Sequence, residues 1–218
     1  MTNGVAGLTC QALIFDLDGV LVDSIVSVEH TWRVWAARHS LDLDTILRSA
    51  HGRRAFDTVR LVAPHLDAAA EIIALSAQEA STTQGLSEVP GAHTLLAALP
   101  PDRWAVVTSG DRAIAEHRLQ HVGLPIPVVM VCGDEVSHGK PDPEGYLVAA
   151  AKLGIAPGAC VVVEDAPSGI DAAQNAGMRV IAVATTHTPE ELRAADAVID
   201  ALSALTVRVH SHGLELCS

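Results

Sequence analysis

Basic and aromatic residues are scarce in this chain. The first shortage argues against binding to nucleic acids and anionic membranes, and the second argues against a core built from aromatic side chains. Lysine and arginine number 14 against 26 aspartates and glutamates, which gives the 218 residues a formal charge of −12. Because nucleic-acid backbones and anionic membrane surfaces attract basic proteins, we expect neither as a partner. Aromatic residues form 3% of the chain and hydrophobic residues 49%. Aliphatic side chains must therefore fill a sizeable core.

CxxC pairs and long apolar runs are also missing, and we expect the first residues not to be a leader segment. The four cysteines (Cys10, Cys132, Cys160 and Cys217) contain no CxxC pair, which favours small buried thiols in a reducing compartment. Residues 1–10 hold no basic residue and no long apolar stretch, unlike a signal peptide. No apolar run approaches the roughly 18 residues of a membrane span. We therefore expect a cytoplasmic protein that is a monomer or a weak dimer.

Short apolar runs alternate with helical patterns along most of the chain. The runs are rich in valine and isoleucine and do not alternate with polar residues, as is typical of strands buried on both faces of a parallel sheet. Gly123, Gly154 and Gly177 follow the helical patterns at the usual stop position. This order predicts a doubly wound, Rossmann-like α/β fold. The expected strands are 12–15, 104–108, 128–132, 160–163 and 180–184, and the helices between them are 111–121, 143–153 and 168–176.

One long stretch interrupts this alternation. Residues 16–103 contain helical patterns at 24–39, 55–63, 68–84 and 90–99 but no convincing strand. A crossover in a parallel sheet needs only about a dozen residues. The surplus predicts a helical domain at residues 22–89, inserted into a core domain formed by residues 1–21 and 90–218. The tail at 206–218 predicts a small hairpin around His212 and Gly213.

Polar residues follow four of the expected strands at their carboxyl ends. Open α/β sheets bind ligands at this edge, so these residues are the candidate site. Each pattern is weak evidence alone, but four of them in order at one edge are hard to produce by chance. The residues are Asp16 and Asp18 after the first strand, Thr108 and Ser109 after the second, Lys140 after the third, and Glu164 and Asp165 after the fourth.

The acidic residues of this set predict a divalent cation. Converging carboxylates repel one another unless a cation neutralises them. Hard oxygen ligands with no histidine or cysteine nearby in the sequence favour Mg²⁺ over zinc. Lys140 supplies a positive charge and Thr108 a hydroxyl, and both groups suit phosphate oxygens.

These motifs resemble those of the haloacid dehalogenase superfamily, over essentially the whole chain. The matching residues are 16–20 for the first motif, 108–109 for the second, Lys140 for the third, and 164–165 with Gly169 and Ala172 for the fourth. The inserted helical domain, which opens with Asp23 and Ser24, is similar to the cap domain of that family.

The resemblance implies a mechanism and a division of roles. Asp16 would attack phosphorus and form an aspartyl-phosphate, and Asp18 would protonate the leaving alcohol and then activate water. Thr108, Ser109 and Lys140 would bind the phosphoryl group. Mg²⁺ would be held by the Asp16 carboxylate, the Asp18 main-chain carbonyl and Asp165, with Glu164 near or in its coordination shell.

A finer resemblance indicates the substrate class. Residues 50–54, 57–60, 88–91 and 104–110 are similar to the branch of glycerol-phosphate and deoxysugar-phosphate phosphatases. This implies a small sugar or polyol phosphate as the substrate, with Arg53 or Arg54 contacting its oxygens. An equal alternative is that both arginines lie at a solvated helix start, and the sequence does not say which of them faces inward.

Several other functions on the same fold compete with a phosphatase. Similar sugar phosphomutases place a histidine five residues beyond the aspartate equivalent to Asp23, where this chain has Val28. A phosphonate hydrolase needs a cap lysine, and residues 23–89 contain none. A dehalogenase needs no second acid, whereas Asp18 is retained. A catalytically inactive binding module remains the alternative from another class, although the complete set of motif residues disfavours it.

Overall fold

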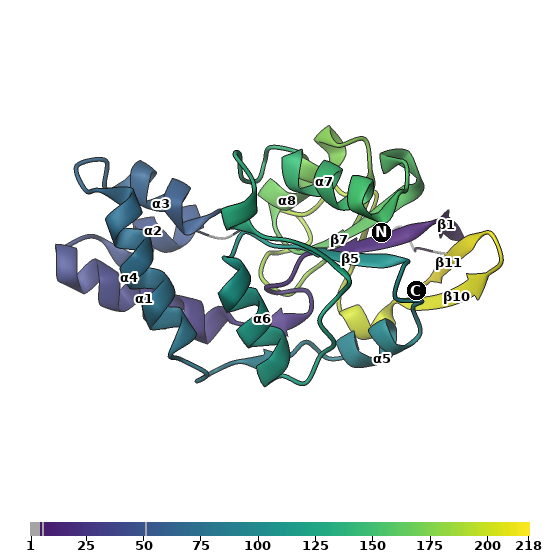
Figure 1. Cartoon of the computed structure of the whole chain (residues 1–218), viewed down its shortest axis with the longest axis horizontal. Helices are drawn as coiled ribbons and strands as arrows, with labels where there is room; N and C mark the ends of the chain where they lie inside the picture. Colours follow the sequence, from purple (N-terminus) through teal and green to yellow (C-terminus); the bar gives the residue numbers. More distant parts are fainter. Residues whose placement is uncertain (1–4, 6, 51) are drawn as a thin grey trace.

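The computed structural model describes residues 5, 7–50 and 52–218 of the chain (Figure 1). His51, which belongs to the resemblance at 50–54, lies outside the described residues, as do residues 1–4 and 6 of the N-terminal segment. None of the helices in the described ranges has the length and apolar content that crossing a membrane requires.

Six parallel strands form the central sheet in the order β6-β5-β2-β7-β8-β9. This confirms the expected α/β fold. The sequence patterns predict five of the strands, and β9 escapes them because its apolar run is only three residues long. The strands are β2 (Ala12–Phe15), β5 (Trp104–Val107), β6 (Val129–Val131), β7 (Cys160–Glu164), β8 (Arg179–Val183) and β9 (Ala197–Ile199).

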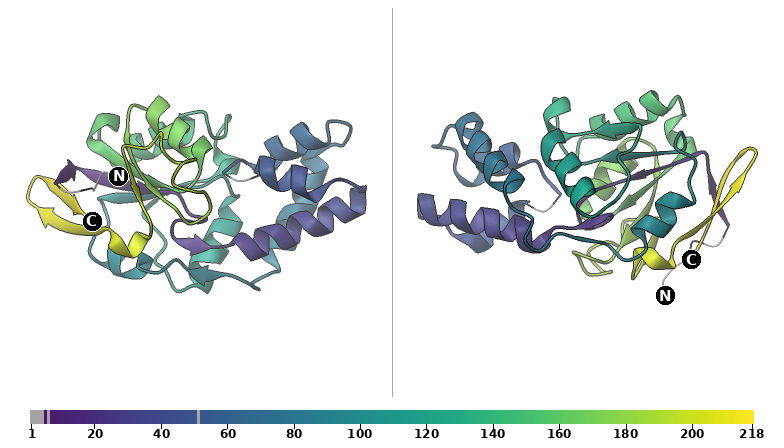
Figure 2. Two further views of the ribbon diagram at one scale, coloured as in Figure 1. Left: turned by 180° about the vertical axis from the view of Figure 1, so that it is seen from behind. Right: turned by 60° about the horizontal axis from the view of Figure 1, so that its bottom comes forward.

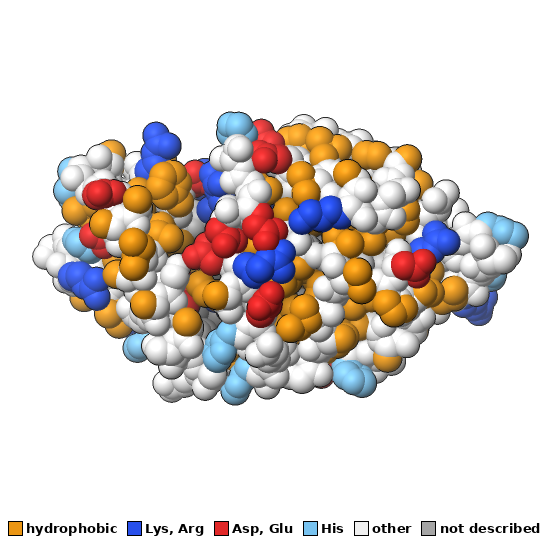
Figure 3. All heavy atoms as spheres, viewed as in Figure 1, with side chains coloured by type: hydrophobic (Ala, Val, Ile, Leu, Met, Phe, Trp, Pro, Cys, Tyr) orange, Lys and Arg blue, Asp and Glu red, His pale blue; other side chains and the backbone are white. Residues whose placement is uncertain are grey.

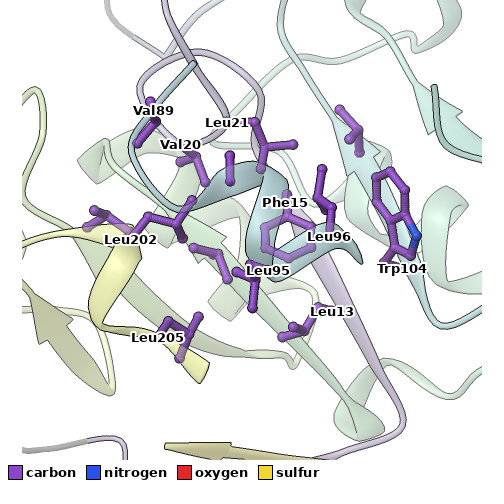
Figure 4. Packing of buried hydrophobic residues seen from close by; sticks show 14 of the residues in the cluster. Leu13, Phe15, Val20, Leu21, Val89, Leu95, Leu96, Trp104, Leu202 and Leu205 are labelled. Carbon is purple, nitrogen blue, oxygen red and sulfur yellow. The ribbon is translucent and has the colours of Figure 1, made fainter. Parts of the chain in front are cut away.

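Helices cover both faces of this sheet. Leu13 and Phe15 of β2 belong to a hydrophobic cluster that includes side chains of α5 and α6, and Figure 4 shows both residues close to α5. Ala12 and Ile14 belong to a second cluster with α7 and α8. Burial on both faces explains why the strands are uninterrupted apolar runs. The helices are α5 (Ala92–Ala97), α6 (Arg112–His121), α7 (Glu144–Leu153) and α8 (Pro167–Asn175), with 3-10 turns at Gly133–Glu135, Pro157–Ala159 and Leu202–Ala204.

Four of the five helices that the structure describes between β2 and β5 form a separate layer, which we call the insertion. Both views of Figure 2 show it beside one end of the sheet. It has its own hydrophobic cluster, in which Trp32 and Trp35 are buried. The chain enters and leaves it through β3 (Val22–Asp23) and β4 (Ser87–Glu88), which pair antiparallel. The helices are α1 (Ile25–His39), α2 (Leu43–Ala50), α3 (Ala55–Val62) and α4 (Ala68–Ala80).

Three details of the insertion differ from the sequence prediction. Strands β3 and β4 lie in the stretch 16–103, where the sequence predicts no strand, because runs of two residues leave no strand pattern. Helix α2 is not predicted, because it is short and buries only Ile46. Its start is capped by Asp42, whose side chain accepts from the Thr45 amide at 2.9 Å. Helix α4 ends at Ala80, four residues before the predicted end at Gln84.

The tail forms a small antiparallel sheet of order β1-β11-β10. The hairpin predicted around His212 and Gly213 is present as β10 (Thr206–His210) and β11 (Gly213–Cys217). Strand β1 (Leu8–Cys10) pairs with β11 and is not predicted, since nothing local shows that its partner lies at the other end of the chain.

Candidate active site

Residues from four loops meet at one edge of the central sheet. β2 lies between β5 and β7, so the residues that follow these three strands become neighbours. The loop after β6 adds Lys140, whose side chain reaches carboxylates that follow β2 and end β7. The structure brings together all seven residues that the motifs predict. Asp16, Thr108, Lys140, Glu164 and Asp165 are buried, and Asp18 and Ser109 are half-buried.

Lys140 lies at the centre of a buried group that also contains Asp16, Glu164 and Tyr146, which we call the Lys140 cluster. Its Nζ pairs with Asp16 Oδ1 and lies 2.6 Å from Glu164 Oε1. The Tyr146 hydroxyl donates to the same Glu164 oxygen at 2.8 Å. The main-chain amides of the two residues after Glu164 donate to its Oε2 at 2.9 and 3.1 Å. Both Glu164 oxygens are therefore occupied, and this carboxylate holds the lysine beside Asp16.

Two motif glycines make room for acidic side chains. A Cβ on Gly169 would overlap the Glu164 carboxylate, and a Cβ on Gly19 would overlap the Asp165 carboxylate. Gly19 also has a φ of +80°, a left-handed conformation that strains other residues. Each glycine is therefore required by the close approach of a carboxylate at the site.

Burial opposes the ionisation of two carboxyls at this edge. It raises the pKa of Asp16 to about 7, against the opposing charge of Lys140 and with a contribution from Glu164. Burial and the charge of Glu164 also raise the pKa of Asp165 well above its usual range. The pKa of Lys140 stays well above its ordinary value despite burial, because Asp16 and Glu164 face it. The single positive charge of Lys140 therefore does not balance the carboxylates of Asp16, Glu164 and Asp165, and the site keeps an excess of negative potential.

The same carboxylates fit a divalent cation. One oxygen from each of Asp16, Glu164 and Asp165 lies within 4.8 Å of the others. Thr186 Oγ1 donates to Asp165 Oδ2 and fixes that side chain. A cation would offset the burial and the repulsion between carboxylates that together raise the pKa of Asp16 and Asp165, and an all-oxygen donor set suits a hard ion.

A cavity of about 390 Å³ lies between the insertion and this edge of the sheet. It is in the size range of pockets that hold small organic ligands. Its lining is acidic and polar on the core side and mixed on the insertion side. The lining residues include Asp16, Asp18, Thr108, Ser109 and Asp165 from the core, and Val28, Trp32, Arg53, Leu75 and Glu79 from the insertion.

The insertion is joined to the core by hydrogen bonds that we call the docking contacts. The Gly52 carbonyl accepts from Ser109 Oγ at 3.0 Å and from Ser168 Oγ at 3.3 Å. Arg54 Nη1 donates to the Val136 carbonyl at 2.9 Å. On the face shown in Figure 3, acidic and basic side chains gather where the insertion meets the core. Polar groups therefore contribute to holding the two parts together at their boundary.

The two arginines of the predicted cap loop differ in their surroundings. Arg54 also pairs with Asp57 at 2.7 Å, and its side chain is only 14% exposed. Arg53 is exposed to solvent and lines the cavity. Both arginines line the cavity, but the Arg54 guanidinium is engaged in docking, whereas Arg53 is exposed.

Sequence reasoning missed another arginine at the site, Arg118 of α6, which contacts a motif residue. Its Nη1 lies 2.5 Å from Asp18 Oδ1 and its Nη2 lies 2.9 Å from Glu79 Oε2. The one available signal is its position in the helix, because Arg118 lies on the buried stripe with Ile114 and Leu119. A charged residue on an apolar stripe needs buried partners, although the sequence does not show which.

Comparisons with known proteins agree with this geometry. The family model of haloacid dehalogenase-like hydrolases matches residues 10–177. The chain is 41% identical to hexitol phosphatase A of Escherichia coli (strain K12), over 94% of this chain and 98% of that protein. It is 31% identical to glycerol-1-phosphate phosphohydrolase 2 of Saccharomyces cerevisiae, over 99% and 91%. A β-phosphoglucomutase structure from Clostridium difficile matches with a TM-score of 0.74 at 25% identity, over 89% and 92%.

The matched region contains every motif residue of the site, from Asp16 to Asp165. The likeness to curated phosphatases of polyol phosphates confirms the branch that the sequence resemblance indicates. This chain belongs to the haloacid dehalogenase-like hydrolase family.

Proposed function

We propose that this chain is a Mg²⁺-dependent phosphatase that hydrolyses a small sugar or polyol phosphate through an aspartyl-phosphate on Asp16. One observation carries the proposal. A buried aspartate is paired with Lys140 and also lines a cavity of about 390 Å³, with a second aspartate, Asp18, beside it.

Asp16 would be the nucleophile, and its surroundings would keep its carboxylate ionised. An aspartate attacks phosphorus only as the carboxylate, and burial disfavours that form. The Lys140 charge favours the ionised form, and Mg²⁺ bound by Asp16, Asp165 and the Asp18 main-chain carbonyl would supply further positive charge for the carboxylate and the phosphoryl oxygens. Glu164 would stay in the outer shell, because both of its oxygens already accept hydrogen bonds.

Other residues would bind the phosphoryl group and move the proton. Thr108 lines the cavity and Lys140 contacts the nucleophile, so both are positioned for phosphoryl oxygens. The Ser109 hydroxyl already donates to Gly52, which leaves its main-chain amide for the ligand. Asp18 would protonate the leaving alcohol and then deprotonate the attacking water.

The proposed substrate class rests on the cavity and the relatives. We propose residues 22–89 as a cap domain that closes over a core of residues 1–21 and 90–218. Arg53 on the cap side would contact substrate oxygens, and the apolar side chains of Trp32 and Leu75 would exclude water. Relatives named for hexitol and glycerol 1-phosphate chemistry support a polyol or sugar phosphate.

A sugar phosphomutase is the second candidate, because a β-phosphoglucomutase shares the fold. A mutase must protect its aspartyl-phosphate from water until the reaction intermediate has reoriented in the cavity and can be rephosphorylated. Val28 lines the cavity at the position where the similar mutases carry histidine. Because valine cannot relay a proton or form a hydrogen bond, this difference favours hydrolysis.

The test is a phosphate-release screen with hexitol, glycerol and deoxysugar phosphates, with β-glucose 1-phosphate included. We expect Mg²⁺-dependent release from polyol or sugar phosphates, none from the Asp16→Asn protein, and no accumulation of glucose 6-phosphate. Interconversion of the glucose phosphates without phosphate release would make the chain a mutase. Lack of turnover of every ester would favour the inactive binding module.

A further inference from the structure

Asp18 is held through only one of its two carboxylate oxygens. Its Oδ1 accepts from Ser24 Oγ at 2.6 Å and from Arg118 Nη1 at 2.5 Å. Within the part of the chain that the structure describes, no side chain donates to Oδ2. The side chain is 29% exposed and lines the cavity. One oxygen is therefore anchored while the other remains available to a ligand.

Arg118 is unusual among the arginines of this chain because it is buried between two carboxylates. Its side chain is 5% exposed, and its second partner, Glu79, is 15% exposed. Burying a guanidinium is costly unless it is paired on each side, so removal of either carboxylate leaves a poorly compensated charge. Arg118 therefore depends on Asp18 and Glu79 together.

The two partners of Arg118 come from different parts of the molecule. Asp18 follows β2 of the core, and Glu79 lies on α4 of the insertion. Arg118 itself lies on α6 of the core. A second contact between α4 and α6, from Ser76 Oγ to Asp111 Oδ2 at 2.6 Å, holds α4 against the start of α6. The Arg118–Glu79 pair therefore forms only while the insertion is docked on the core.

We infer that Arg118 is a positioning residue that orients Asp18 when the insertion is docked. Glu79 holds one end of the guanidinium, and the other end fixes Asp18 Oδ1 so that Oδ2 faces the cavity. Undocking removes Glu79 and frees Arg118 to leave Asp18. The proton donor is thus aligned only when the cavity is closed from water, and this inference rests on the proposed phosphatase function.

The inference is tested by the dependence of kcat/KM on the leaving group. Substituted phenyl phosphates of similar size differ in how much their leaving groups need a proton, and kcat/KM reports steps up to formation of the aspartyl-phosphate. A poorly aligned Asp18 should penalise basic leaving groups most. In Arg118→Met we expect the 4-methylphenyl ester to lose on the order of tenfold more kcat/KM than the 4-nitrophenyl ester.

Three further variants keep the test decisive. Glu79→Gln should steepen the same dependence to a smaller extent, and it decides the outcome if Arg118→Met does not fold. Arg118→Lys should recover part of the lost alignment. Ser168→Ala removes one docking contact but leaves the Ser109–Gly52, Arg54–Val136 and Arg118–Glu79 contacts in place, so it should keep the leaving-group dependence of the unmodified protein even if rates fall.

The result that overturns the inference is an equal loss of kcat/KM across the whole ester series in Arg118→Met, or in Glu79→Gln if only that variant folds. Failure of the proposed function is seen separately. In that case the unmodified protein releases no phosphate from any ester, or the Asp16→Asn protein releases as much.

Discussion

Two buried basic side chains, Lys140 and Arg118, differ in which parts of the molecule their carboxylate partners come from. Lys140 lies between Asp16, which follows β2, and Glu164, which ends β7, so both partners belong to the core. Arg118 lies between Asp18 of the core and Glu79 of the insertion. Each cation has a side chain that is 5% exposed. The ion pairs of Lys140 therefore lie within one part of the molecule and build a fixed site, whereas those of Arg118 cross the boundary between the core and the insertion.

Lys140 can be fixed because its surroundings are rigid. Both of its carboxylate partners lie at the ends of paired strands, and Glu164 is held by the Tyr146 hydroxyl and by main-chain amides. Arg118 has no such frame on its far side, because Glu79 is near the end of α4. Changes at Lys140 should therefore affect every substrate, and changes to the Arg118–Glu79 pair should affect most the esters whose leaving group needs a proton.

The largest expected effect comes from removing the metal. Chelation should abolish phosphate release, since the excess negative potential around Asp16 and Asp165 would then repel the phosphoryl group. Mg²⁺ should restore activity, and Ca²⁺ should restore it poorly because it prefers more ligands at longer distances. Phosphate release titrated with each ion after chelation measures this. Full activity in excess chelator would contradict the role given to the acidic residues.

Lys140→Met should have the next largest effect and should act on both stability and rate. It leaves Asp16 and Glu164 buried without their cation, a change that typically costs about 3–5 kcal/mol of unfolding free energy. Urea unfolding and kcat for two unrelated esters measure the two effects. We expect both esters to lose activity equally.

The matched control for this substitution is Lys152→Met. Lys152 is the chain's other lysine, and its side chain is 48% exposed. Its removal should change the unfolding free energy by no more than about 0.5 kcal/mol. If the two substitutions were equally harmless, the Lys140 cluster would not be the rigid centre of the site.

The smallest effects should separate the two cap-loop arginines. Arg53→Ala should lower kcat/KM for the best polyol phosphate by about tenfold and much less for 4-nitrophenyl phosphate, because only the polyol reaches that side of the cavity. Arg54→Ala should lower both rates together, because it removes a docking contact to Val136. Steady-state kinetics on both esters distinguish these patterns. If both variants lost activity toward the polyol phosphate only, the separate roles given to Arg53 and Arg54 would be wrong.

The same contrast explains how much could be predicted from the sequence. Asp16, Lys140 and Asp165 were predictable because each follows an apolar strand, and parallel strands bring their carboxyl ends to one edge. The strand pattern therefore carries the spatial information. The sequence does not reveal helix α2 or strands β3, β4 and β9 because each is short, and it does not reveal β1 because its partner β11 lies at the other end of the chain.

Arg118 could not be predicted for a different physical reason. It is 100 residues from Asp18 and 39 from Glu79, and their meeting depends on how the insertion packs on α6. The roles of Arg53 and Arg54 were left open for the same reason, since neighbouring residues at a helix start can face opposite surroundings. Local patterns reveal strand ends, but they do not reveal contacts between separately packed helices.

The most direct test of the central claim is detection of the phosphoryl group on Asp16. The Asp18→Asn protein should form the aspartyl-phosphate from an activated ester such as 4-nitrophenyl phosphate but hydrolyse it slowly, because it lacks the group that activates water. Acid quenching, digestion and mass spectrometry should then find one added phosphoryl group on the peptide that contains Asp16. A phosphoryl group on another side chain, or turnover by Asp18→Asn with no labelled peptide, would contradict the account.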